Sequence, residues 1–333
     1  MATVAQRRRR RQRLRRLTGH LRPSPNGVAS PTPDELLLAW LEFANTLPVP
    51  SDSALPRFQA DDTQAILAQF AQTGTAVVDG ALSTAELREL NDFCDASQRD
   101  GRWSAAGEYP QPLLDGEAVD AFVRHPATFA AIEAALGGAG CSRFGQFEFR
   151  DIPRAAPPMR MGVHRDRPDS VNLADPFGGG VSGFGTSPVD GTLHYSGEPQ
   201  RRLDSPSAPL TDYLCAVTYL TDVSPSTPAF CLVPNSFRVP ISALRGRDQT
   251  RAAHEVAALM AETHDGYTPL PVYGKAGTMI LYDVATFHTR ADPMDAEGNP
   301  TTGERRRSLH RYFGRAVRTT RLCALHLIYI ATC

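Results

Sequence analysis

The stretch DYLCAVTYLTDVSPSTPAFCLVPNSF, residues 212–237, contains two β-rich runs on either side of a turn. The runs, 212–223 and 229–237, are short and rich in β-branched and aromatic residues, and serine, proline and threonine separate them. Three more runs of this kind follow the same pattern, at 142–152, 277–284 and 306–315. Short strands that recur between turns predict a largely antiparallel sandwich or barrel.

Helical patterns precede most of these strands. Residues 63–74 are apolar at helical spacing and end at Gly74, and a short apolar strand, 75–82, follows. Ser83 and Glu86 form the sequence signature of a capping box, which predicts a helix that begins there. Residues 117–138 continue the helical periodicity. Helices first and strands afterwards predict an α+β fold.

The first part of the chain differs from the rest in composition. Residues 1–31 begin with a basic segment that we interpret as a disordered tail, with a transit peptide as the alternative. Residues 32–56 predict a capped helix followed by a linker rich in proline and serine. A second stretch rich in glycine, proline, serine and aspartate, 167–210, is too long for an ordinary loop and predicts a functional insertion.

The charge distribution disfavours general nucleic-acid binding. The formal net charge is −1, but residues 1–22 carry nine arginines and no acid, which leaves the remaining chain at −10. Such a body repels phosphates, so only the head could make weak contacts with nucleic acid. The six cysteines have no metal-like spacing, which favours a reducing cytoplasm, and no run is long enough to predict a membrane helix.

The segment MGVHRDRPD, residues 161–169, contains a histidine and an aspartate two positions apart. A kinase catalytic loop would need an asparagine where Val171 stands, together with an upstream lysine, and the chain has only Lys275. The glycine pattern at 178–183 follows no strand and opens no helix, so it does not predict a dinucleotide site. In an extended chain the two side chains point to one side, which leaves a metal site as the best interpretation.

A non-haem iron centre needs two histidines and one carboxylate. His164 and Asp166 would supply two of these ligands, and His288, 124 residues later at the end of an apolar strand, is the best candidate for the third. We assign no metal role to the remaining candidates, which lie in loop-like, helical or later strand segments: His194, His254, His264, His310 and His326.

Three open iron positions would suit a 2-oxo acid and O2, and the far carboxylate of the acid would need a cation. The run 305–307 offers three arginines on the strand after His288. Alternation places Arg306, Ser308, His310 and Tyr312 on one face of that strand, but the sequence leaves open which face points inward. A solvated charge cluster is the alternative interpretation of these arginines.

This set of segments resembles the phytanoyl-CoA dioxygenase-like family of Fe(II)/2-oxoglutarate oxygenases. Four stretches carry the resemblance over about 57–315: FAQTGTAVVDGALSTAELRELNDFCD, GVHRDRP, CAVTYLTDVSPSTPAFCLVPNSF and GTMILYDVATFHT followed by RRRSLHRYF. The chain departs from the family in having Asn235-Ser236-Phe237 where Gly-Ser-His is usual, and a longer gap of 18 residues between His288 and its arginine.

The resemblance implies a double-stranded β-helix, a jelly-roll or cupin-like barrel with flanking N-terminal helices, in which 57–333 is a single oxygenase domain. It implies that His164, Asp166 and His288 bind Fe(II), that Arg306 binds 2-oxoglutarate, and that Gln146 contacts this co-substrate. Related halogenases lack the carboxylate ligand, so Asp166 favours hydroxylation.

The expected activity is therefore that of a dioxygenase that hydroxylates an unactivated C–H bond of a small organic molecule and releases succinate and CO2. A natural product, an amino acid or a lipid-like acid are all possible substrates. Two alternatives are a cupin-like metal-binding protein without oxidative activity and a nucleic-acid-modifying oxygenase recruited by the arginine-rich head.

Overall fold

The computed structural model describes residues 55–103, 108–110, 118–156, 210–211, 213–234, 236–238, 269–284 and 286–315. The helix predicted at the start of 32–56, the metal pair His164 and Asp166, and all but the last residue of the insertion 167–210 lie outside this part of the chain. The division into tail, linker and single domain therefore stays a prediction.

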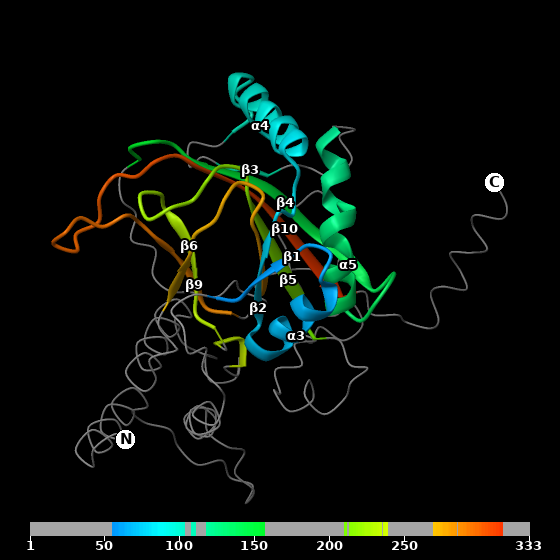
Figure 1. Ribbon diagram of the computed structural model, residues 1–333. Helices are drawn as coiled ribbons and strands as arrows, with labels where there is room; N and C mark the ends of the chain where they lie inside the picture. Colours follow the sequence, from blue (N-terminus) through cyan, green and yellow to red (C-terminus); the bar gives the residue numbers. More distant parts are fainter. Residues whose placement is uncertain are drawn as a thin grey trace, which may run out of the picture.

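The α-helices of the described chain lie near its start and most of the strands follow them, as the sequence predicts (Figure 1). In chain order they are β1 (Arg57–Gln59), α3 (Thr63–Thr73), β2 (Thr75–Asp79), α4 (Thr84–Arg99), β3 (Glu108–Pro110), the 3-10 helix η1 (Ala118–Arg124), α5 (Pro126–Ala135), β4 (Ser142–Ile152), β5 (Tyr213–Tyr219), β6 (Ala229–Leu232), η3 (Ser236–Arg238), β7 (Leu270–Val272), β8 (Met279–Asp283), β9 (His288–Ala291) and β10 (Arg306–Arg315).

The strands form two sheets. The larger sheet has the order β1-β2-β8-β5-β10-β4-β3, and the smaller has the order β7-β6-β9. Every pair of neighbouring strands is antiparallel except β1 and β2. The presence of both helices and largely antiparallel sheets confirms the predicted α+β class. The described residues do not show a closed double-stranded β-helix, so that finer assignment remains a proposal.

Two apolar cores lie on the opposite faces of the larger sheet. Alternation along β5 sends Leu214 and Ala216 into the core under the helices, and Cys215 and Val217 into the core that faces the smaller sheet. Figure 1 shows α3 and α5 on one side of the larger sheet and the strands β6 and β9 on the other. The space between the sheets is therefore the place where inward-facing polar side chains from both sheets can meet.

Local signals set the boundaries of the first two helices. Helix α4 begins at a complete capping box, in which Ser83 Oγ accepts from the Glu86 N–H and Glu86 accepts from the Ser83 N–H. Helix α3 ends at Gly74, which adopts φ of 73° and donates its N–H to the Phe70 carbonyl. Both ends agree with the sequence prediction.

Replacing Gly74 with alanine should lower the free energy of unfolding by about 2–4 kcal/mol. A Cβ at this position would lie 2.4 Å from Phe237 Cδ1 and would also be forced into the left-handed region. Gly101→Ala is the matched control, because its φ of 70° is similar but no atom lies within 4 Å of the new Cβ. Urea unfolding should show a clearly smaller loss for Gly101→Ala, and equal losses would contradict the steric explanation.

The segment predicted as one helix at 117–138 is two elements. Proline cannot donate to the preceding turn and disfavours the helical region for the residue before it. His125 precedes Pro126 and has ψ of 122°, so the chain leaves η1 there and begins α5 with the proline in its first turn. The short strands β1, β3, β7 and β9 were not predicted, because runs of three or four residues carry little periodicity.

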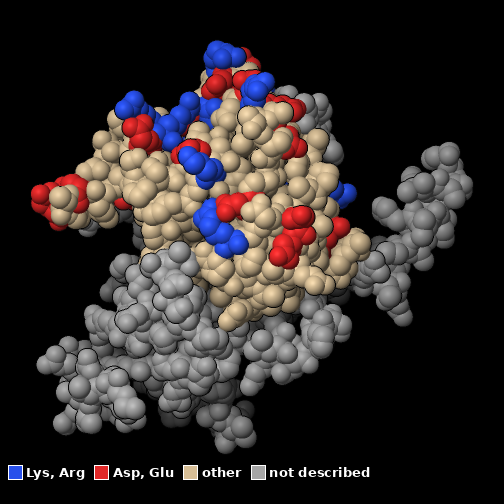
Figure 2. Space-filling view, in the orientation of Figure 1, with Lys and Arg blue, Asp and Glu red and all other residues tan. Residues whose placement is uncertain are grey.

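The described residues show where the buried cysteines and the surface charges lie. Cys94, Cys215 and Cys231 are free and buried, and burial raises the pKa of Cys94 and Cys231 to about 12. On the face shown in Figure 2, basic and acidic side chains lie side by side rather than in separate patches. Among the helices described here, none is long and apolar enough to span a membrane.

Candidate active site

His288 is the first residue of β9 and lies in the space between the two sheets. The sequence suggested that it ends the preceding strand, but β8 stops at Asp283 and a turn separates the two. His288 is 5% exposed, and its imidazole packs against the rings of Phe230 and Tyr282, with centroid distances of 5.3 and 5.0 Å. The turn thus moves the histidine from the larger sheet into the smaller one, where it faces the interior.

A backbone hydrogen bond sets the tautomer of His288. Its Nδ1 lies 3.0 Å from the Thr286 carbonyl oxygen, which can only accept, so Nδ1 carries the proton and donates. In the neutral form of the ring, this leaves the lone pair on Nε2. A histidine oriented in this way by a backbone carbonyl has the arrangement that metal-ligating histidines commonly have. The chemistry of His288 therefore fits the metal role that the sequence predicts.

The other two predicted ligands, His164 and Asp166, lie outside the described residues, so the structure does not bring the three together. Within the described part of the chain no group of three or more histidine, cysteine, aspartate or glutamate side chains could hold a metal ion. The triad with His288 remains a prediction.

Arg306 opens β10 as a buried cation. It is 5% exposed, and its Nη1 donates to the Pro228 carbonyl at 3.2 Å. Its Nε has no hydrogen-bond partner, and no ion pair joins it to a carboxylate among the described residues. Burial lowers the pKa of Arg306 to about 10, so the side chain is still charged at neutral pH. A charged guanidinium with an unsatisfied buried donor is suited to bind an anion.

The neighbouring arginines have a different role. Arg307 is 2% exposed and binds Asp151 and Asp95 through Nη2 at 3.2 and 2.7 Å. Arg305 binds the same Asp151 carboxylate at 2.5 Å. Asp95 lies on α4 and Asp151 on β4, so these arginines tie the helix to the larger sheet. This resolves the face of β10 that the sequence left open: Arg306 faces the smaller sheet, and Arg307 faces the helices.

The two sheets bring further polar side chains into the same interior. On β4, Glu148 is 4% exposed and accepts from Arg150 Nε at 2.5 Å. On β9, Arg290 donates from Nε to Asp292 at 2.6 Å, and both side chains are less than one-tenth exposed. Neither pair was predicted from the sequence. For Glu148 and Arg150 the signal was the alternation of charged with apolar residues along β4, a pattern that was considered only for β10.

His310, to which we assigned no metal role from the sequence, lies on the same face of β10 as Arg306. It is 2% exposed, its Nε2 lies 3.1 Å from Ser308 Oγ, and its ring meets the edge of Phe230. Burial, the charges of Arg150 and Arg306, and the ring of His288 together hold the pKa of His310 well below its usual value. His310 is therefore neutral, and it is close enough to interact with both His288 and Arg306.

Gln146, predicted to contact the co-substrate, lies on β4 opposite Tyr312 in the register with β10. Its side chain is outside the described part of the structure. Its contact with a co-substrate stays a prediction.

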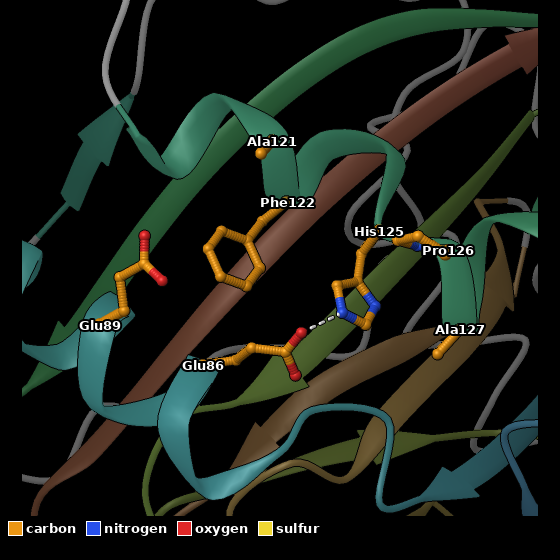
Figure 3. A pocket seen from close by; sticks show the side chains of 7 residues that line it. All are labelled: Glu86, Glu89, Ala121, Phe122, His125, Pro126 and Ala127. Atoms are coloured by element: carbon orange, nitrogen blue, oxygen red, sulfur yellow. Dashed lines mark hydrogen bonds and ion pairs between the residues drawn. The ribbon is translucent and has the colours of Figure 1, made fainter.

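A separate cavity of about 510 Å³ lies on the helical side of the molecule, lined by Glu86, Glu89, Ala121, Phe122, His125, Pro126 and Ala127 (Figure 3). His125 Nε2 lies 2.7 Å from Glu86 Oε1, and its ring stacks on Phe122. The other Glu86 oxygen caps α4. The Glu86–His125 pair links the start of α4 to the junction of η1 and α5. We therefore interpret it as a structural contact between these elements.

No protein-family model and no curated protein matches the sequence. The structure is similar to SnoK, a non-heme alpha ketoglutarate dependent carbocyclase from nogalamycin biosynthesis, with TM-score 0.49, 15% identity, and coverage of 78% of this chain and 87% of that one. It is also similar to HygX from Streptomyces hygroscopicus, solved with nickel and 2-oxoglutarate bound. The TM-score is 0.47 and the identity 18%, with coverage of 75% of this chain and 86% of the HygX chain. For EvdMO1 the TM-score is 0.48 and the identity 15%, over 77% of this chain. The match spans only 50% of the EvdMO1 chain. With these TM-scores, the likeness alone assigns neither fold nor function.

Proposed function

We propose that this protein is an Fe(II)- and 2-oxoglutarate-dependent oxygenase that hydroxylates a C–H bond of a small organic molecule. The observation that carries the proposal is the pairing, in one buried space, of a histidine whose Nδ1 donates to a backbone carbonyl and an arginine without a carboxylate partner among the described residues. The first suits a metal, and the second suits the free carboxylate of a 2-oxo acid.

Each residue has a specific task in this proposal. His288 would bind Fe(II) through Nε2, held by its Nδ1 hydrogen bond to Thr286, and His164 and Asp166 would complete the ligand set predicted from the sequence. Arg306 would bind the distal carboxylate of 2-oxoglutarate. Bound iron supplies the oxidative chemistry with O2 that side chains lack, converting 2-oxoglutarate into succinate and CO2 as the substrate is oxidised.

The surrounding residues support the binding of a dianion. Arg150 and Arg290 each have a carboxylate partner, Glu148 and Asp292, so these two pairs are close to neutral. Arg306 supplies the unbalanced positive charge. The rings of Phe230 and Tyr282 pack against His288 and exclude water from one side of the site. A low-dielectric interior strengthens the attraction between the arginine and a carboxylate.

Membership of the phytanoyl-CoA dioxygenase-like family and a closed jelly-roll barrel are part of the same proposal. They rest on the four sequence stretches, of which three fall on described elements: the first on α3, β2 and α4, the third on β5, β6 and η3, and the fourth on β8, β9 and β10. The intact Asp166 favours hydroxylation over halogenation within the proposal.

An anaerobic titration of the purified protein with Fe(II) and 2-oxoglutarate tests the proposal. The wild-type protein should develop the visible charge-transfer band of an iron–oxoglutarate complex. His164→Ala, Asp166→Ala and His288→Ala should lose or weaken it, because each removes one ligand. His264→Ala is the matched control and should keep the band. A folded wild-type protein that binds iron but develops no band would overturn the proposal and favour a cupin-like protein without oxidative activity.

A further inference from the structure

The hydroxyl of Tyr219 reaches from the larger sheet to the smaller one. Tyr219 is the last residue of β5, and its side chain is fully buried in the core between the sheets. Its hydroxyl accepts from the Phe230 N–H at 3.1 Å and donates to the Val272 carbonyl at 2.8 Å. Phe230 on β6 and Val272 on β7 are partners in the register of the smaller sheet. One side chain of the larger sheet thus holds two strands of the smaller sheet at a single point.

Both hydrogen-bonding functions of the hydroxyl are used in this contact. Burial raises the pKa of Tyr219 to about 12, so the phenol keeps its hydrogen at neutral pH and donates it to the carbonyl. Without the hydroxyl, two buried backbone groups would lose a shared partner, and a buried polar group that loses its partner is costly. The two strands would have to move to restore these contacts, and Phe230 would move with them.

The ring of Phe230 packs on the imidazole of His288. The two rings are stacked, with 22° between their planes and 5.3 Å between their centroids. The hydrogen bond from His288 Nδ1 to the Thr286 carbonyl fixes one direction of the imidazole, but a single bond leaves the ring free to turn about that direction. A stacked ring restricts this turning, because tilting the imidazole breaks the packing. Phe230 and Thr286 therefore place different constraints on where Nε2 points.

A second contact between the sheets does not duplicate the one that Tyr219 makes. Arg306 lies on β10, the neighbour of β5, and its Nη1 donates to the Pro228 carbonyl. Pro228 precedes β6, which begins at Ala229, so this bond holds the approach to the strand. The hydroxyl of Tyr219 is the contact that holds the backbone of Phe230 itself.

We propose that Tyr219 is a positioning residue for the metal site, which acts through Phe230 to hold the imidazole of His288 in the orientation that a metal requires. This inference rests on the proposed function, because it takes His288 as a ligand of Fe(II). The effect is indirect: the hydroxyl fixes the backbone of Phe230, the ring of Phe230 fixes the imidazole, and the imidazole presents Nε2. Groups that orient a metal ligand in this way strongly influence metal affinity.

Nuclear magnetic resonance of the metal-free full chain, with labelled histidine, tests the first step. The ring of Phe230 shifts the resonances of the imidazole beside it, so these resonances report on the position of the ring. Tyr219→Phe removes only the hydroxyl and should shift the His288 resonances, which are identified by their loss in His288→Gln. Tyr273→Phe is the matched control, because it removes a phenol hydroxyl next to Val272 in the chain from a side chain that is 37% exposed. It should leave the His288 resonances unchanged.

Anaerobic calorimetry with Fe(II) tests the second step. Tyr219→Phe should raise the dissociation constant for Fe(II) about 10-fold, as expected when a group that orients a ligand is lost. Phe230→Leu should have a similar effect, since it removes the ring and keeps the backbone N–H. The double variant should bind no more weakly than either single variant, because the hydroxyl acts through the ring. Tyr273→Phe should stay within about twofold of wild type.

Phe230→Leu carries the test by itself if Tyr219→Phe fails to fold, as judged by circular dichroism. The hydrogen bond to Tyr219 comes from the backbone of residue 230, so this variant keeps it and removes only the ring that meets His288. A folded Phe230→Leu protein with unchanged His288 resonances and unchanged Fe(II) affinity would overturn the inference.

Two further results would also contradict it. Unchanged His288 resonances in Tyr219→Phe would mean that the hydroxyl does not position the imidazole. Additive losses of Fe(II) affinity in the double variant would mean that Tyr219 acts independently of Phe230. Both results leave the proposed function intact, because the wild-type protein still binds Fe(II) and 2-oxoglutarate. A wild-type protein that does not bind Fe(II) would instead remove the proposed function and, with it, the role given to Tyr219.

Discussion

Arg306→Met should raise the dissociation constant for 2-oxoglutarate on the order of 100-fold, because it removes about 3 kcal/mol of charge-assisted hydrogen bonding in a desolvated site. Calorimetry under anaerobic conditions with Fe(II) measures this directly. Methionine keeps much of the apolar volume of the arginine stem, so the change is mainly one of charge and donors.

The same replacement should leave the free energy of unfolding unchanged or raise it. Arg306 is buried, has no carboxylate partner among the described residues and has an unsatisfied Nε, so it contributes a desolvation cost to the fold. A residue retained for stability would behave in the reverse way, with a lower free energy of unfolding and little effect on binding. Urea unfolding of the same samples distinguishes the two cases.

Arg154→Met is the matched control for Arg306→Met. The Arg154 side chain is 77% exposed and pairs only with the half-exposed Glu304 within the described residues. Loss of one positive charge from the surface should leave the dissociation constant within about twofold of wild type, because solvent screens it. If both variants lose affinity equally, the effect is due to overall charge, and the assignment of Arg306 as the carboxylate anchor is wrong.

Elements with strong local signals could be predicted from the sequence. The end of α3 at Gly74 follows from the need for a left-handed residue, and the start of α4 follows from the box that Ser83 and Glu86 form. Strands β4 and β10 have the same bounds as the predicted runs, because ten or more alternating residues leave little choice of conformation. These features depend on neighbours in the sequence.

The orientation of β10 could not be predicted, because it depends on distant residues. Arg307 faces the helices since Asp151 on β4 and Asp95 on α4 lie there to receive it. Arg306 then faces inward by alternation. Neither carboxylate is near β10 in the sequence, so periodicity alone left both faces open.

The Arg290–Asp292 pair could not be recognised for a related reason. Arg290 follows His288 by two residues and therefore shares its face, but the sequence did not identify β9 as a strand. A four-residue strand is fixed by its pairing with β6, not by its own pattern. The metal role of His288 was predicted by resemblance and by its position after an apolar run, whereas its hydrogen bond to Thr286 could be seen only in the structure.

Asp151→Asn should lower the free energy of unfolding by about 3 kcal/mol at pH 7, because it removes the charge that compensates a buried guanidinium. Asp151 is 4% exposed and accepts from Gln98 at 2.7 Å, from Arg305 at 2.5 Å and from Arg307 at 3.2 Å. Asp95 still binds Arg307 in the variant, which limits the loss. Urea unfolding provides the measurement.

The pH dependence gives the same prediction a second test. Burial alone would raise the pKa of Asp151, but hydrogen bonds from Arg305 and Gln98 and the charge of Arg307 outweigh it and lower the pKa below its usual value. A carboxylate with a lowered folded-state pKa stabilises the fold above its unfolded pKa, about 3.9, and loses that stabilisation as the pH falls through the folded value. The difference in unfolding free energy between wild type and Asp151→Asn should therefore be constant from pH 5 to 7 and shrink below about pH 4.

Asp222→Asn is the matched control for this stability prediction. Asp222 also has a lowered pKa, from its hydrogen bond to Lys275, but both side chains are exposed to solvent. Its replacement should leave the unfolding free energy almost unchanged at every pH, since exposed ion pairs are screened by water and salt. A similar loss in both variants would mean that net charge, and not the buried Asp151 network between α4 and the larger sheet, stabilises this protein.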